Sequence, residues 1–147
     1  LKYSKQMVDD VSQLVYLHLR FHGYGDSKWT DSAVRRYVTD AGPLLGRLHK
    51  LVRADCTTRN KQRAAHLRAS YDQLEARIAA LAEKEDLQRI RPDLDGNEIM
   101  RLLDIPPGPQ VGEAWHYLKE LRLERGPLSR EEATAELLAW WETRRNR

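Results

Sequence analysis

The sequence predicts an all-α fold on three observations. Apolar residues recur three and four positions apart along nearly the whole chain, capping residues and Gly/Pro breaks separate these stretches, and no stretch has the alternating pattern of a strand. The chain has 147 residues, enough to bury one core, and 32% of them are charged. Because no long apolar run interrupts these charges, we expect no membrane-spanning segment.

The first expected helix carries an apolar stripe and is broken near Gly23 and Gly25. The stripe consists of Met7, Val11, Leu14, Val15, Leu17 and Leu19. This spacing is typical of a helix that packs along one side.

Two short helices follow a loop. Thr30 or Asp31 caps the first of them, and Gly42 closes it before Pro43 begins the next. Their expected apolar faces are Ala33, Val34, Tyr37 and Val38 in the first helix and Leu44, Leu45, Leu48, Leu51 and Val52 in the second.

From Lys61 the pattern lengthens into one helix that we expect to reach about Gln88. Its apolar residues are spaced alternately three and four apart: Ala64, Leu67, Tyr71, Leu74, Ile78 and Leu81. This rhythm is typical of a helix packed lengthwise, either in a homodimeric coiled coil or on helices of its own chain. The repeat is short, which favours packing within the chain.

The last part of the chain predicts further helices around a Pro/Gly corner. Asp95 begins a short helix, and Ile105-Pro106-Pro107-Gly108-Pro109 forms a rigid corner before the next helix opens near Pro109. Ser129 with Glu132 makes a capping box for the final helix, whose anchor residues are Ala133, Leu137, Trp140 and Trp141.

The corner is the feature that points to a function. A helix that begins near Pro109 leaves its first amides without partners inside the helix, at the positive end of the helix dipole. These are the amides of Gln110, Val111 and Gly112. Such an end binds anions such as phosphate, although an ordinary corner between two helices is the alternative interpretation.

Positive charge is concentrated in one segment. The formal net charge is +3, but between Arg47 and Arg68 only one acid, Asp55, faces a series of cations. These are Arg47, Lys50, Arg53, Arg59, Lys61, Arg63 and Arg68. Such a cluster attracts a polyanion in a salt-dependent way, while a charge run alone is equally compatible with a solvated helix face.

Cysteine content and the N-terminal sequence indicate where the protein works. Cys56 is the one cysteine, which excludes an internal disulfide, and the first ten residues hold no apolar stretch of signal-peptide length. We expect a cytoplasmic protein.

Two segments resemble one family. In the stretch from Arg91 to Trp115, Asp93-Leu94-Asp95-Gly96, Ile99-Met100, Pro107-Gly108-Pro109 and Val111-Gly112 follow one another. This order resembles the C-terminal tRNA-binding region of bacterial CCA-adding tRNA nucleotidyltransferases and of their poly(A) polymerase relatives. The segment from Trp29 to Lys61 resembles the end of the HD-type helical region of actinobacterial members. Together these segments extend the resemblance over nearly the whole chain.

The resemblance implies a C-terminal fragment of such an enzyme. Residues 1–60 would end an HD-like helical domain, residues 61–90 would form a long connecting helix, and residues 91–147 would form a tRNA-binding tail. The catalytic head, with its Gly-Ser or Gly-Gly turn and metal-binding Asp-x-Asp, has no counterpart here. We interpret Asp95 of Asp93-Leu94-Asp95 as a helix cap. We expect no catalytic residue and no cofactor in this chain, and Mg²⁺ with CTP and ATP in the parent enzyme.

The implied partner is tRNA, held by its acceptor and T arm. Because A-form RNA hides its base edges in a deep groove, we expect contacts to the backbone to dominate. The expected RNA-binding residues are Arg59, Lys61 and Arg63 in the basic cluster, Gly108, Gln110, Val111 and Gly112 at the corner, and Lys119 and Arg122 beside it. These residues do not separate CCA addition from poly(A) synthesis, and the oligomeric state stays open.

A metal site is considered at His18, His22 and Asp55. Two histidines four apart face the same side of a helix and could share a metal ion. The resemblance places Asp55 at the last aspartate of an HD metal site, whose first His and His-Asp pair are absent here. We therefore expect weak or no metal binding, with His18 as a packed or surface histidine.

Two other patterns are interpreted as structural. Glu85-Asp86-Leu87-Gln88-Arg89 matches the Glu-Asp-x-x-Arg pattern with which class II CCA-adding enzymes select nucleotides, but here it follows the HD-like region instead of preceding it, so we attribute it to chance. Cys56 lies seven residues after His49, about 10 Å along a helix, which is too far for proton transfer, so Cys56 is expected to be packed.

Two rival functions come from other classes. An HD-type phosphohydrolase would use His18, His22 and Asp55 as remnants of its active site. A helix-hairpin-helix-like DNA-binding module would present its Gly-containing turn to a duplex backbone. Titration with tRNA, DNA duplex and single strand at two salt concentrations separates these hypotheses.

Overall fold

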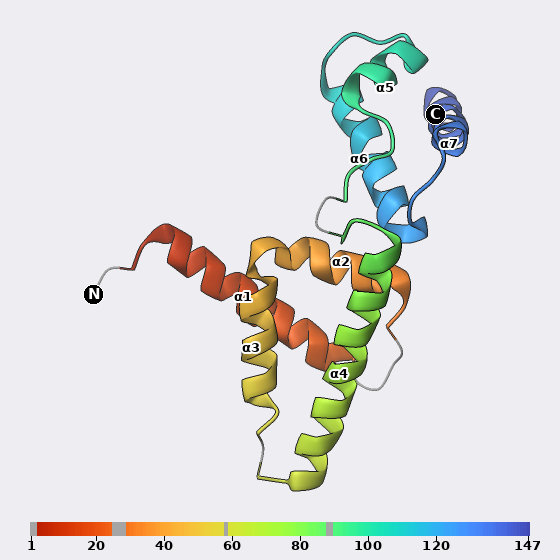
Figure 1. Ribbon diagram of the computed structural model, residues 1–147. Coiled ribbons are helices and arrows are strands. Elements are labelled where there is room, and N and C mark those ends of the chain that lie inside the picture. The colour runs from red at the N-terminus through yellow and green to blue at the C-terminus, as the bar shows by residue number, and fades with distance from the viewer. Residues whose placement is uncertain (1–2, 25–28, 58, 88–89) are drawn as a thin grey trace. The chain divides into compact units, whose positions relative to one another are not determined.

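The computed structural model describes residues 3–24, 29–57, 59–87 and 90–147, without the side chains of residues 22–24. Within these ranges every regular element is a helix and no strand occurs, which confirms the all-α prediction (Figure 1). Contacts divide the chain into two compact units, residues 1–88 and 89–147.

The first unit consists of α1 (Lys5–Tyr24), α2 (Asp31–Ala41), the short 3-10 helix η1 (Gly42–Leu44), α3 (Leu45–Asp55) and α4 (Lys61–Lys84). α1 packs on α2 and α3, and α4 packs on the same two helices. Figure 1 shows α3 and α4 leading into and out of one turn.

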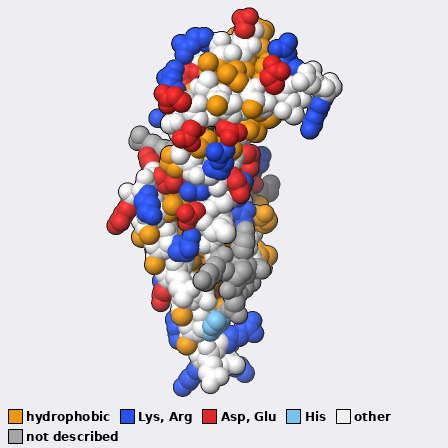
Figure 2. Space-filling model, turned by 90° about the vertical axis from the view of Figure 1, so that its right-hand side faces the viewer, with side chains coloured by type: hydrophobic (Ala, Val, Ile, Leu, Met, Phe, Trp, Pro, Cys, Tyr) orange, Lys and Arg blue, Asp and Glu red, His pale blue; other side chains and the backbone are white. Residues whose placement is uncertain are grey.

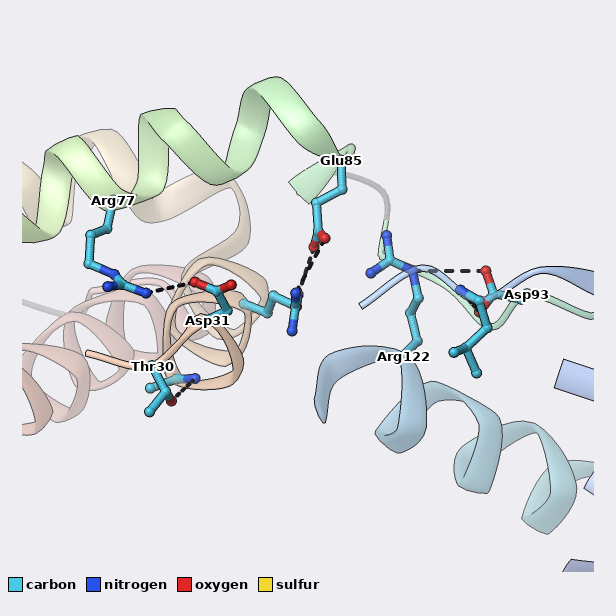
Figure 3. A network of polar contacts seen from close by, with 9 residues as sticks. Thr30, Asp31, Arg77, Glu85, Asp93 and Arg122 are labelled. Carbon is cyan, nitrogen blue, oxygen red and sulfur yellow. Dashed lines mark hydrogen bonds and ion pairs between the residues drawn. The ribbon is translucent and has the colours of Figure 1, made fainter. Parts of the chain in front are cut away.

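Side-chain caps fix where two of these helices begin. Thr30 Oγ1 accepts a hydrogen bond from the Ala33 amide at 3.1 Å, so Thr30, rather than Asp31, caps α2 (Figure 3). Asn60 Oδ1 accepts from two amides of the first turn of α4, at 3.1 and 3.2 Å. Gly42 ends α2 with φ 52°, a conformation that favours glycine.

Aromatic rings occupy the centre of the first unit. The rings of Phe21 and Tyr71 meet edge to face with centroids 5.0 Å apart, and those of Trp29 and Tyr37 do so at 5.2 Å. The buried apolar residues around them are Leu17, Val34, Val38, Ala41, Leu48, Val52, Leu74 and Leu81. Of the expected face of α3, only Leu48 and Val52 are fully buried.

Most of the expected stripe of α1 is exposed within its unit. Leu17 is fully buried, but Met7, Val11, Val15 and Leu19 are 47–61% exposed. The helix contacts α2 and α3 through the side that carries Leu17 and, one turn later, Phe21. These four positions of the apolar stripe therefore lie at the surface of the unit.

α4 is a single helix of 24 residues that ends at Lys84, slightly before the expected end. The residues of its three-four rhythm are buried or half-buried, and they pack on α2 and α3 of the same unit. By these contacts α4 belongs to the same compact unit as α1, α2 and α3.

The second unit consists of α5 (Gly96–Leu103), α6 (Pro109–Arg125) and α7 (Arg130–Arg145), packed around one core. The core residues are Leu94, Ile99, Leu103, Ala114, Leu118, Ala133 and Leu137. Asp95 Oδ1 accepts from the Glu98 amide at 2.8 Å, and Ser129 Oγ accepts from the Glu132 amide at 3.1 Å. Both predicted caps are thereby confirmed.

The turn from α6 to α7 contains a glycine and lies beside a partly buried ionic contact. Gly126 ends α6 with φ 84°, which other residues rarely adopt. Asp93 Oδ2 accepts from the Leu128 amide at 3.3 Å, and Arg122 Nε lies 4.0 Å from Asp93 Oδ1 (Figure 3). Burial raises the pKa of Asp93.

Candidate nucleic-acid interface

The predicted corner is an exposed turn at the start of α6. Asp104 ends α5 in a left-handed conformation with φ 53°, and the Ile105 amide bonds to the Met100 carbonyl at 3.1 Å. Residues 106–110 are then exposed, and α6 begins at Pro109. A ligand can therefore reach the backbone of this turn from solvent.

No side chain caps the first turn of α6. Its N-cap, Gly108, has no side-chain acceptor, whereas the other two helices of the unit are capped by side chains. The Val111 amide donates to the Gly108 carbonyl at 3.1 Å. This amide, which the sequence predicted to bind phosphate, therefore already has a hydrogen-bond partner. Gln110 and Gly112 are exposed and remain the accessible positions beside the turn.

The two cations predicted beside the corner lie in different surroundings. Lys119 is half-buried on α6, and its Nζ lies 5.4 Å from the centroid of the Trp115 ring. The Arg122 side chain is 8% exposed and faces Asp93, because its position on α6 points inward after Leu118 (Figure 3). A phosphate cannot reach a buried guanidinium, and we therefore remove Arg122 from the interface.

The predicted cations of the first unit surround the turn between α3 and α4. Arg59, Lys61 and Arg63 are exposed, and so are Arg47 and Lys50 on α3; none of the five forms an ion pair with any residue that the structure describes. Figure 2 shows Lys and Arg side chains at the end of the unit where α3 passes into α4. The sequence cluster thus becomes a local concentration of uncompensated positive charge.

Arg53 and Arg68 differ from the rest of the cluster. Arg53 bonds to Asp72 at 2.8 Å and to Glu75 at 2.9 Å, which holds its pKa above the ordinary value. Arg68 donates to the Cys56 carbonyl at 3.5 Å. Arg53 is therefore neutralised by acids of α4 and adds little to the attraction of a polyanion.

Only part of the considered metal site is described. His18 Nε2 and Asp55 Oδ2 are in direct contact, joining α1 to α3. The side chain of His22 lies outside the described residues. Among the described residues no three His, Cys, Asp or Glu side chains are grouped so that they could hold a metal ion.

Cys56 and His49 are engaged separately. Cys56 is fully buried, its Sγ lies 3.2 Å from the Val52 carbonyl oxygen, and burial raises the pKa of its thiol. His49 Nδ1 bonds to the Tyr71 hydroxyl, and burial lowers the pKa of its imidazole. The interpretation of Cys56 as a packed residue is confirmed.

The segment that matches a nucleotide-selecting motif in sequence begins with Glu85, which has a partner inside the first unit. The Glu85 carboxylate bonds to Arg35 Nε at 2.7 Å, and both side chains are buried (Figure 3). Arg89, at the other end of the motif, lies outside the described residues. The carboxylate of Glu85 is therefore not presented to a ligand.

Two aromatic–cation pairs of the second unit were not predicted from the sequence. Lys119 lies over Trp115, and Arg144 lies over Trp140 with its guanidinium carbon 5.4 Å from the ring centroid. Each cation follows its aromatic partner by four residues, which places them on one side of a helix. This four-residue spacing could have predicted both pairs from the sequence.

No helix among the described residues has the length and apolar character that a membrane crossing requires.

Comparison with known proteins gives two informative relatives. The chain is 32% identical over 142 residues to the CC-adding tRNA nucleotidyltransferase of Thermus thermophilus, a match that covers 95% of this chain and 30% of that protein. It is 33% identical over 113 residues to the A-adding tRNA nucleotidyltransferase of Deinococcus radiodurans, covering 76% of this chain and 26% of that protein. Both relatives are tRNA nucleotidyltransferases. The chain spans less than a third of the length of either.

No protein-family model matches the chain, and no solved structure matches it. The match to the Thermus enzyme includes nearly all of both compact units.

Proposed function

We propose that this chain is the tRNA-binding portion of a CCA-adding tRNA nucleotidyltransferase. It holds the acceptor and T arm of the tRNA while a catalytic head outside this chain extends the 3′ end. The observation that carries the proposal is the similarity of 95% of the chain to a CC-adding tRNA nucleotidyltransferase. It agrees with the order of residues around the Pro/Gly corner.

The names of the two relatives favour a role in holding tRNA over a role in choosing the nucleotide. One relative adds CC and the other adds A, yet the chain is about equally similar to both, at 32% and 33% identity. A segment shared by enzymes that add different nucleotides serves what their reactions have in common, which is the tRNA. The structural role of Glu85 supports the same view.

The geometry supports contacts to the RNA backbone in each unit. The exposed turn at Gly108 offers an uncapped helix start, and Arg59, Lys61 and Arg63 offer uncompensated charge around a separate turn. Both features recognise phosphates without reading sequence. Mg²⁺, CTP and ATP belong to the reaction of the head, and the described residues contain no group suited to hold the metal.

A binding titration tests the proposal. The chain is titrated with tRNA and with a DNA duplex of similar length at two salt concentrations, and we expect tighter binding to tRNA that weakens as salt rises. Equal affinity for DNA would favour a general duplex-binding module, and affinity indifferent to salt would contradict the phosphate contacts.

Charge variants locate the contacts. Arg59→Gln with Arg63→Gln should weaken tRNA binding and lower the slope of log affinity against log salt by about one unit for each lost contact. The matched control is Lys5→Gln with Lys84→Gln, which removes equal charge from exposed positions far along the chain from the α3–α4 turn. Equal losses of tRNA affinity in both double variants would show that only the net charge of the chain matters, and not the position of these cations.

The full-length enzyme distinguishes CCA addition from poly(A) synthesis. The full-length enzyme is given CTP, ATP and a tRNA without its 3′-terminal CCA. A CCA-adding enzyme stops after it has added these nucleotides. A ladder of adenylates would instead identify a poly(A) polymerase.

A further inference from the structure

Trp115, Trp140 and Trp141 are all half-buried against the core of the second unit, and they differ in what contacts their rings. Trp140 stacks on Tyr117 with centroids 5.0 Å apart, and Arg144, over the Trp140 ring, is held by an ion pair with Glu113. Trp115 meets the His116 ring edge to face with centroids 5.4 Å apart, and the ammonium of Lys119, which forms no ion pair with any described residue, lies over the Trp115 ring at 5.4 Å. Because the lysine side chain is flexible, another group can displace its ammonium from the ring.

Trp115 and Lys119 continue the surface that begins at the exposed turn. Gly112, Trp115 and Lys119 follow one another by three and four residues, so they lie on one side of α6. The distance from residue 112 to residue 119 along the helix is about 10 Å. One strand of B-form DNA advances ~3.4 Å per nucleotide, and on that scale this side of α6 is roughly three nucleotides long.

The relative strength of two contacts decides what the ring prefers. A lysine over an indole strengthens an association by about two- to fivefold when it is exposed and by about thirtyfold when it is desolvated, and Lys119 is half-buried. A nucleobase stacked on an aromatic side chain strengthens RNA binding by about 5- to 150-fold. A base that stacks on Trp115 in the upper part of this range therefore displaces Lys119, whose ammonium then becomes available to a neighbouring phosphate.

We propose that Trp115 is a stacking site for an unpaired base of the bound RNA, with Lys119 pairing with the adjacent phosphate. The base must be unpaired because bases inside an A-form duplex are already stacked and their edges are hidden. This inference rests on the proposed function and deepens it, since it assigns to the second unit a preference for RNA with unpaired nucleotides.

The test uses three RNAs and matched tryptophan variants. The chain is titrated with tRNA, with a hairpin whose loop is unpaired, and with a blunt duplex of equal length. Trp115→Leu should lower affinity about tenfold for tRNA and hairpin, and change affinity for the duplex less than about twofold. Trp115→Phe should retain most of the affinity, and Lys119→Gln should lower the salt slope by about one unit.

Trp141→Leu is the control, because Trp141 is also half-buried against the core of the second unit. Trp141→Leu should bind all three RNAs as the unchanged chain does, and circular dichroism checks that each variant keeps its helices. An equal loss for duplex and hairpin in Trp115→Leu, or an equal loss in Trp141→Leu, overturns the stacking site.

Failure of this inference is separable from failure of the proposed function. If Trp115→Leu binds tRNA normally while Arg59→Gln with Arg63→Gln weakens it, the stacking site is overturned and the tRNA-binding role stands. If the unchanged chain binds none of the RNAs, both are overturned.

Discussion

Arg35 and Glu85 form a buried ion pair across fifty positions of the chain. Arg35 Nε donates to Glu85 Oε1 at 2.7 Å, and the side chains are 7% and 4% exposed (Figure 3). The pair joins α2 to the residue that caps the end of α4. Because breaking a buried pair leaves one charge without compensation, this contact is important for the stability of the first unit.

Removing one partner of this pair should be far more harmful than removing both. Arg35→Met or Glu85→Leu alone should lower the free energy of unfolding by about 3–5 kcal/mol, while the double variant should lose much less, because apolar residues replace both charges. Urea unfolding of the four proteins measures this. Additive losses in the double variant would show that the two charges do not depend on each other.

The exposed side of α1 should tolerate charge. Val11→Lys, at a position 53% exposed, should change the free energy of unfolding by no more than about 0.5 kcal/mol, whereas Leu17→Ala should cost about 2–5 kcal/mol. Thermal unfolding of both variants is the measurement. A large loss for Val11→Lys, or dissociation of an oligomer, would mean that this side is covered in solution.

Two glycine substitutions should have opposite effects. Gly126→Ala forces a side chain into φ 84° and should cost about 1–2 kcal/mol. Gly46→Ala lies inside α3, where an added Cβ meets nothing within 4 Å, and should gain about 0.5–1 kcal/mol. Chemical unfolding compares them, and a destabilising Gly46→Ala would contradict the open surroundings of that position.

His49 should make stability depend on pH. Burial, the largest cause, lowers the pKa of His49 below 6.5, with Glu75 acting to raise it and Arg53 to lower it. The unfolded chain therefore binds the proton more tightly, so the stability present above pH 6.5 is lost as the pH falls through 6.5 toward the folded-state pKa.

The measurement is urea unfolding between pH 7.5 and 5.5, where one such group contributes at most about 1.4 kcal/mol per pH unit. His49→Gln should remove this part of the dependence. Burial raises the pKa of Asp93, whose contribution has the opposite sign, and the comparison with His49→Gln separates the two groups. An unchanged slope in His49→Gln would assign the effect to another group.

Local sequence signals predicted the helices well, because periodicity and caps are local properties. Thr30, Asp95 and Ser129 cap helices as expected, and the rhythm of α4 lies on its packed side. What the sequence did not reveal depends on tertiary neighbours. Nothing local distinguishes Val11, which is exposed, from Leu17, which is buried.

The same limit applies to the candidate interface. The cluster of Arg59, Lys61 and Arg63 was evident from the sequence, but the burial of Arg122 depends on Asp93, which is distant in the chain. The hydrogen bond from the Val111 amide to the Gly108 carbonyl depends on the geometry of the first turn of α6. Such differences concern single hydrogen bonds and cannot be obtained from spacing.

The burial of Cys56 has a practical value. It is the one thiol of the chain, it is fully enclosed, and its raised pKa keeps it protonated and slow to alkylate. A cysteine introduced at the exposed position of Gln110 would therefore be the one that maleimide dyes and photocrosslinkers attach to. The native protein thus permits a reporter to be placed beside the α6 turn without first removing a competing sulfhydryl.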